Sequence, residues 1–134
     1  MSNLGLLSEV ALYERLDGHH SLVKLLECFE QGKFIYFAFD LIALGDLQNY
    51  MVSHKIPFLC ESELRSGTKQ VLEGLHATHD AGFSHNHVQP RHFLLRNKQK
   101  KPWSARVKLA GFSHATPTCE ALEFRRPTSC TNWS

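Results

Sequence analysis

The sequence predicts one α+β domain in which helices alternate with short strand pairs. Apolar residues recur at helical spacing over residues 4–16 and 61–81. Two other segments are predicted strands that flank a glycine-containing turn: residues 22–29, which read L-V-K-L-L-E-C-F, and residues 34–41, which are rich in aromatic and β-branched side chains. The 134 residues suffice for one domain that buries about two-thirds of the surface of the unfolded chain.

The helical spacing of apolar residues predicts the first helix, and the turn residues predict the first pair of strands. Apolar side chains give residues 4–16 one apolar face, and Gly18 ends the helix because glycine readily adopts the backbone conformation that follows a last helical turn. The two strands are joined by a tight turn at residues 31–33, so we expect them to pair as a hairpin.

The second half of the chain is interpreted in the same way. Asp46 opens a short helix, and Pro57 interrupts the chain before the long helix over residues 61–81. Two short strands over residues 93–95 and 106–109 flank a polar, lysine-rich loop. The long helix is expected to bury one apolar face, formed by Leu64, Val71, Leu72 and Leu75.

The end of the chain shows no periodic pattern. From Thr116 onward the sequence carries Pro, Ser, Thr, Cys and Arg residues without helical or strand spacing. We therefore expect a domain over residues 1–116, followed by a disordered or irregular tail over residues 117–134.

Composition excludes several classes of function. The net charge of +2 is small and the basic residues are scattered, so nucleic-acid binding is not expected. The longest apolar run, Phe34–Phe39, is far shorter than the roughly 20 residues that span a bilayer. The four cysteines are widely spaced and no apolar signal segment opens the chain, which favours a reducing compartment. We expect an intracellular protein, cytoplasmic or nuclear, without membrane contact.

Short motifs in the second half of the chain resemble those of eukaryotic serine/threonine protein kinases. Residues 79–85 read H-D-A-G-F-S-H, similar to the H-x-x-G-x-x-H that precedes the family's catalytic loop. Residues 85–92 read H-N-H-V-Q-P-R-H in place of H-R-D-x-K-P-x-N, and residues 111–113 read G-F-S in place of D-F-G. The resemblance covers roughly residues 4–116. It implies a partial kinase-like fold with helix C, the fourth and fifth strands, the hinge, helices D and E, and the catalytic-loop region.

The resemblance also shows what this sequence lacks. Glu9 stands at the glutamate of helix C, but no glycine-rich phosphate loop and no lysine partner precede it. No A-P-E segment follows residues 111–113. We therefore expect a truncated kinase-like domain.

The positions of the catalytic machinery hold degenerate residues, by the same resemblance. An imidazole at the aspartate position, His87, can accept a proton near neutral pH but cannot supply the negative charge of a carboxylate. His92 and Gly111 replace the asparagine and aspartate that hold Mg²⁺, a cation that prefers oxygen ligands. We therefore assign no catalytic residue and no metal site. The degenerate positions are His85, His87, Gln89, His92, Gly111 and Phe112.

A vestigial nucleotide pocket is implied in the same way. Phe39 stands at the gatekeeper position, Asp40 and Ile42 in the hinge, Asp46 at the usual ribose contact, and Leu94 in the pocket floor. Because the upper part of the pocket has no counterpart, core packing is the favoured role of these residues. No cofactor is expected. A stack of Tyr13, Leu25, His85 and Phe112 is also implied, as the family's regulatory spine.

The sequence thus favours an inactive pseudokinase fragment that acts, if at all, by binding or scaffolding a protein partner, such as another kinase or its substrate. Whether it is an enzyme stays open. The alternative is a divergent serine/threonine kinase fragment that binds ATP and Mg²⁺ and transfers phosphate weakly through His87. Two further alternatives are a transition-metal site on His87, His92 and His114, and a degenerating gene product without a selected function.

Overall fold

The fold has the α+β class that the sequence predicts. The computed structural model describes residues 3–96, 106–118 and 130–131. The helices of this part of the chain are α1 (Asn3–Arg15), α2 (Leu47–Ser53) and α3 (Glu61–Asp80). None of the helices in the described ranges is long and apolar enough to cross a membrane.

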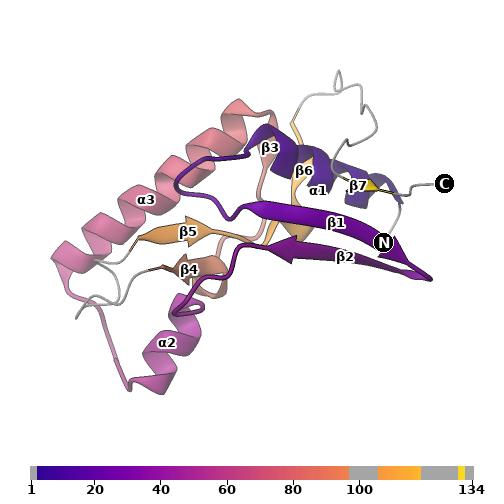
Figure 1. Ribbon diagram of the computed structural model, residues 1–134. Coiled ribbons are helices and arrows are strands. Elements are labelled where there is room, and N and C mark those ends of the chain that lie inside the picture. The colour runs from indigo at the N-terminus through magenta and orange to yellow at the C-terminus, as the bar shows by residue number, and fades with distance from the viewer. Residues whose placement is uncertain (1–2, 97–105, 119–129, 132–134) are drawn as a thin grey trace.

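A hairpin and three small strand pairings accompany the helices. The hairpin strands are β1 (Leu25–Gln31) and β2 (Phe34–Phe39), and β1 also pairs in parallel with β7 (Cys130–Thr131). Antiparallel pairs join β3 (Phe83–Ser84) to β6 (Thr116–Pro117) and β4 (Phe93–Leu95) to β5 (Val107–Leu109). In Figure 1, α3 runs along the β4–β5 pair, and α1 lies against the hairpin.

The first predicted strand divides between two partners. Residues 25–31 pair with β2 as expected, but residues 21–23 pair with β5 instead. The backbone N–H of Val23 donates to the carbonyl of Leu109 at 3.0 Å, and the N–H of Leu109 donates to the carbonyl of Ser21 at 2.8 Å. The start of this strand therefore connects the hairpin to the lower part of the fold, which carries α3.

The buried face of α3 differs from the predicted one. Leu64 is 46% exposed and Leu72 is 57% exposed, so two of the expected core residues face outward. The residues that α3 buries are instead mostly small: Gly67, Val71, Gly74 and Thr78. Small side chains allow the helix backbone to approach β5 closely, and a leucine stripe on that face would hold it away.

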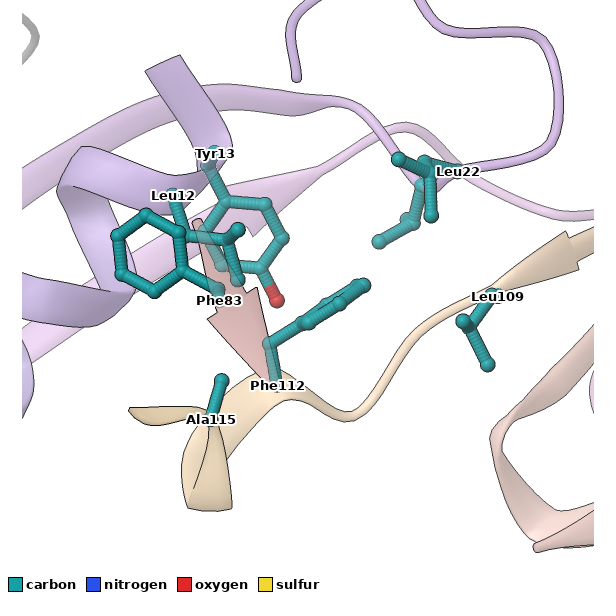
Figure 2. Packing of buried hydrophobic residues seen from close by; sticks show 8 residues of the cluster. Leu12, Tyr13, Leu22, Phe83, Leu109, Phe112 and Ala115 are labelled. Atoms are coloured by element: carbon teal, nitrogen blue, oxygen red, sulfur yellow. The ribbon is translucent and has the colours of Figure 1, made fainter. Parts of the chain in front are cut away.

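The main core lies between α1, the start of the first predicted strand and the segment after β5. Its buried residues are Leu12, Tyr13, Leu22, Val23, Phe83, Leu109, Phe112 and Ala115. Figure 2 shows the Tyr13 ring of α1 beside the Phe112 ring. The two rings meet edge-on, with 5.6 Å between their centroids. A second cluster of Leu47, Val71, Leu95 and Val107 fixes α2 and α3 against β4 and β5.

Part of the predicted tail is ordered by pairing. Thr116 and Pro117 pair with β3, and the N–H of Thr118 donates to the carbonyl of Gly82 at 2.8 Å. Such two-residue strands have no period that a sequence could reveal. Residues 119–129 and 132–134 lie outside the described part, so the boundary between residues 116 and 117 stays a prediction.

Candidate functional site

His85 is a buried structural residue at the start of the loop that follows β3. Its Nε2 lies 2.8 Å from the Ala110 carbonyl, and its Nδ1 lies 3.1 Å from the His87 backbone N–H. Because a carbonyl only accepts and an N–H only donates, we assign a neutral ring with the proton on Nε2. Burial lowers the pKa of His85, nearby histidines add to this effect, and the hydrogen bond to Ala110 opposes it. The ring also packs against Phe112 at 4.7 Å.

His92 lies directly over Gly111. The His92 Nδ1 donates to the carbonyl of His87 at 2.8 Å, which fixes the ring orientation. Gly111 has a φ of +76°, and a Cβ added to it would overlap the His92 ring. The His92 imidazole therefore fills the space that any side chain at position 111 would need. The two residues that replace the family's Mg²⁺ ligands by the resemblance are in contact, and they contribute no oxygen ligand from a side chain.

Gln89 connects two of the histidines. Its Nε2 lies 3.2 Å from His87 Nε2 and 3.4 Å from His92 Nε2. Since His92 carries its proton on Nδ1, its Nε2 accepts from the amide. His87 Nδ1 is buried, and no hydrogen-bond partner for it is found in the described part of the chain. Burial lowers the pKa of His87, and the neighbouring His114 and His92 lower it further.

The histidine rings meet edge to face and do not converge on a point. The His87 ring lies 4.5 Å from the His114 ring and 5.0 Å from the His92 ring, both in edge-on geometry. Within the described residues, no group of three or more His, Cys, Asp or Glu side chains is placed to hold a metal ion. The geometry therefore gives the transition-metal alternative on His87, His92 and His114 no support.

Asn86 is a site residue that sequence reasoning missed. It has a φ of +64°, which asparagine tolerates better than most residues. Its Nδ2 donates to the His114 carbonyl at 3.0 Å and to Thr116 Oγ1 at 2.8 Å. Asn86 thus connects the loop after β3 to the segment after Gly111. An asparagine between two histidines was the available signal, but only the fold shows its partners.

A pocket of about 430 Å³ lies between the hinge, α1 and the segment after β5. Four of the five residues predicted for the vestigial nucleotide pocket contribute to its lining: Phe39, Asp40, Ile42 and Leu94. Asp46 does not line it and instead caps α2, because its carboxylate accepts from the Asn49 N–H at 2.8 Å. Whether a nucleotide binds there stays a prediction.

Glu9 and Tyr13 extend this pocket toward α1. The Tyr13 hydroxyl is hydrogen-bonded to the Glu9 carboxyl. Burial raises the pKa of Glu9, and this hydrogen bond opposes the shift. Burial also raises the pKa of Tyr13, and the Glu9 charge adds to the effect. Glu9, for which the sequence shows no lysine partner, is thus hydrogen-bonded to a tyrosine of its own helix.

The rings predicted to stack as a spine do come together. Tyr13 contacts Phe112, and Phe112 contacts His85, while Leu25 packs against the same core. This contiguous column joins α1 to the loop after β3.

Comparison with known proteins identifies similar sequences. The family model described as "Protein kinase domain" matches residues 2–133. The chain is 32% identical over 97 residues to calcium/calmodulin-dependent protein kinase type II of Caenorhabditis elegans, covering 72% of this chain and 13% of the relative. It is 32% identical over 108 residues to calcium-dependent protein kinase 4 of Plasmodium berghei, covering 81% and 20%. It is 28% identical over 110 residues to the phosphorylase b kinase gamma catalytic chain of Bos taurus, liver/testis isoform, covering 81% and 26%. The chain therefore spans about a quarter or less of the length of these relatives.

Proposed function

The chain belongs to the protein kinase family, and from this premise we propose that it is an inactive kinase-like protein that acts by binding other proteins. Its partner would be another kinase or a kinase substrate, which the kinase-like surface binds without chemistry. We place this function in the cytoplasm or the nucleus.

One observation carries the proposal of inactivity, namely the contact between His92 and Gly111. Phosphoryl transfer needs a divalent cation, and Mg²⁺ needs hard oxygen ligands. Gly111 has no side chain, and the His92 ring occupies the space above it. His92 offers only a nitrogen, which already accepts from Gln89. Both positions that would hold the cation are thus unsuited to it.

The residue at the catalytic-base position supports the same proposal. The pKa of His87 is lowered, so the ring is neutral at pH 7 and adds no negative charge to the site. General-base help by itself contributes only about 10²–10⁴ in rate. Without a cation site, proton transfer to His87 would therefore account for only a small part of the rate enhancement of a kinase.

A phosphotransfer assay tests inactivity. The purified chain is incubated with γ-labelled ATP, Mg²⁺ and a mixture of protein acceptors, and the label in protein is counted. We expect no incorporation above the control without the chain. Incorporation that disappears in a His87→Asn variant would overturn the proposal, since this variant cannot act as a base at that position.

A weak kinase remains the second candidate, because the pocket does gather Phe39, Asp40, Ile42 and Leu94. A thermal-shift titration with ATP separates the two functions. The inactive protein is expected to gain no stability that depends on Mg²⁺. A rise in the melting temperature that requires both ATP and Mg²⁺ would instead favour the kinase fragment.

A further inference from the structure

The short strand β7 brings two cysteines, far apart in the sequence, to neighbouring positions of one sheet. β7 pairs in parallel with β1, and the register sets Cys130 opposite Cys28 and Thr131 opposite Phe29. Neighbouring strands lie about 4.8 Å apart, and residues in register lie on the same face of a sheet. Disulfide-bonded cysteines have Cα atoms roughly 4.4–6.8 Å apart. The backbone register therefore places Cys28 and Cys130 within the separation that a disulfide bond spans.

Cys28 is enclosed in the folded protein. It carries a reduced thiol, and it is the one buried residue of β1. With no exposed surface, it is closed to reagents in solution as long as the fold stays shut. β7 has only two residues, so few hydrogen bonds hold it, and so short a strand opens at a low cost in free energy. Local opening of this strand pair is the route by which an oxidant would reach the two thiols.

We propose that Cys28 and Cys130 form a reversible disulfide bond when the protein meets hydrogen peroxide, and that this bond locks β7 onto β1. The peroxide O–O bond breaks as one thiolate becomes a sulfenic acid, and the other oxygen leaves as water. The second thiolate then attacks that sulfur, the S–S bond forms, and the hydroxyl takes up a proton and leaves as a second water. Two thiols are oxidised and one peroxide is reduced. The inference concerns a covalent modification, so it goes beyond the proposed function.

The bond would fix how one edge of β1 is covered. The strand order is β2–β1–β7, so β7 covers the edge of β1 that β2 leaves open. An uncovered strand edge presents backbone groups with which another chain can pair. The disulfide would keep this edge covered, and exchange with glutathione would release it again. Transient disulfides of this kind are the ones that occur in reducing compartments, which the cysteine spacing favours for this chain.

Peroxide treatment of a Cys60→Ser/Cys119→Ser variant of the whole chain tests the proposal, because Cys28 and Cys130 are then its only cysteines. Position 60 is the N-cap of α3, where serine is favourable. The reduced variant is oxidised, its remaining thiols are alkylated, and the digested protein is analysed by mass spectrometry without reduction. We expect a peptide that links Cys28 to Cys130, a monomer on a non-reducing denaturing gel, and loss of the link in dithiothreitol. The wild-type chain should form this pair in preference to any pair that includes Cys60 or Cys119.

Cys130→Ser/Thr131→Cys, made in the same variant, is the matched control. It keeps the number of cysteines but moves one of them by a single residue, to the other face of the strand and opposite Phe29. We expect this shifted cysteine to link to Cys28 at least about tenfold more slowly.

Thermal unfolding measures whether the bond locks the strand. The Cys60→Ser/Cys119→Ser variant should melt at a higher temperature when oxidised than when reduced, because a bond from residue 28 to residue 130 restricts most of the unfolded chain. The proposal is overturned if no linked peptide forms, if the wild-type chain prefers another pair, if the shifted cysteine links as fast, or if oxidation leaves the melting temperature unchanged. Circular dichroism before oxidation confirms that each variant is folded.

Discussion

Gly111 and His92 fit together, at the two positions where the resemblance to protein kinases predicts that the metal ligands have been replaced. Gly111 leaves room that the His92 ring occupies, and the ring is held there by its hydrogen bond to the His87 carbonyl. The two residues are matched in volume. A glycine alone would leave a gap, and a histidine alone would collide with the side chain at position 111. A larger side chain at position 111 would therefore need a change at position 92 as well.

Gly111→Ala is expected to destabilise the protein by about 2–4 kcal/mol, from the positive φ and the overlap with His92. Gly18→Ala is the matched control. Gly18 has a φ of +78° and no atom within 4 Å of an added Cβ, so this variant should lose only the backbone part, about 1–2 kcal/mol. Urea unfolding measures both values. In a His92→Ala background, which removes the ring atoms that an added Cβ would overlap, the cost of Gly111→Ala should approach that of Gly18→Ala. Equal costs in both backgrounds would contradict the packing argument.

Stability is expected to fall as the pH drops below 6.5, because the pKa values of His85 and His87 are lowered in the folded state. The unfolded chain then binds protons that the folded protein excludes, so the stabilisation present above pH 6.5 is lost on acidification. Urea midpoints at pH 7.5 and pH 5.5 measure this loss.

His87→Leu should reduce the pH dependence, and His79→Gln, an exposed control on α3, should keep it. The raised pKa of Glu9 has the opposite effect on stability, which it increases on acidification. Glu9 is present in both variants, so its effect cancels when the two pH dependences are compared. Equal pH dependence in both variants would contradict the role of His87.

At the scale of single elements, α3 shows how small residues position a helix. A Cβ at Gly74 would lie 3.1 Å from the Ser21 carbonyl oxygen and 3.2 Å from Leu22 Cδ2. That carbonyl accepts the Leu109 N–H, so it cannot shift without breaking the bridge between residues 21–23 and β5. Thr78 adds a hydrogen bond from its hydroxyl to the Gly74 carbonyl at 2.8 Å.

Gly74→Ala therefore sets helix propensity against packing. Alanine gains about 1 kcal/mol in a helix interior, and overpacking against fixed backbone costs about 1–3 kcal/mol. We expect a net loss of up to about 2 kcal/mol in the free energy of unfolding. Ser66→Ala on the exposed side of α3 is the control, and it should change stability by less than about 0.5 kcal/mol. A clear gain in stability for Gly74→Ala would show that the helix can move away from β5.

At the scale of the whole molecule, large apolar side chains remain on the surface. The most exposed are Leu41 at 91%, Phe58 at 77%, Val52 at 73% and Phe34 at 65%. Apolar surface of this extent favours association with other proteins or with further copies of the chain. It agrees with a protein that acts by binding. Since this apolar area is not buried on folding, we expect low stability for the isolated chain.

Phe58→Ser/Leu72→Gln is expected to reduce self-association without lowering stability. Both side chains are exposed, at 77% and 57%, so their replacement should change the free energy of unfolding by about 0.5 kcal/mol or less. Sedimentation velocity at rising protein concentration measures association, and we expect the wild-type chain to form larger species than the variant. A wild-type chain that stays monomeric and unfolds cooperatively at high temperature would contradict the expectation of marginal stability.

The sequence by itself determined the features that depend on neighbouring residues. Helical spacing and turn glycines predicted α1, α3 and the hairpin, and motif order predicted the kinase family, which the family model confirms. It also placed Phe39, Asp40, Ile42 and Leu94 together, because motif positions fix which elements meet.

Only the tertiary structure decided which distant residues share a space. The outward direction of Leu64 and Leu72 follows from the close approach of α3 to β5, which the helical period alone cannot reveal. Asp46 does not line the pocket, because its carboxylate caps the N-terminus of α2. The contact of His92 with Gly111 joins residues that the β4–β5 pair separates in sequence. Local patterns set the conformation of a segment, whereas packing depends on volumes and backbone positions that come from the whole fold.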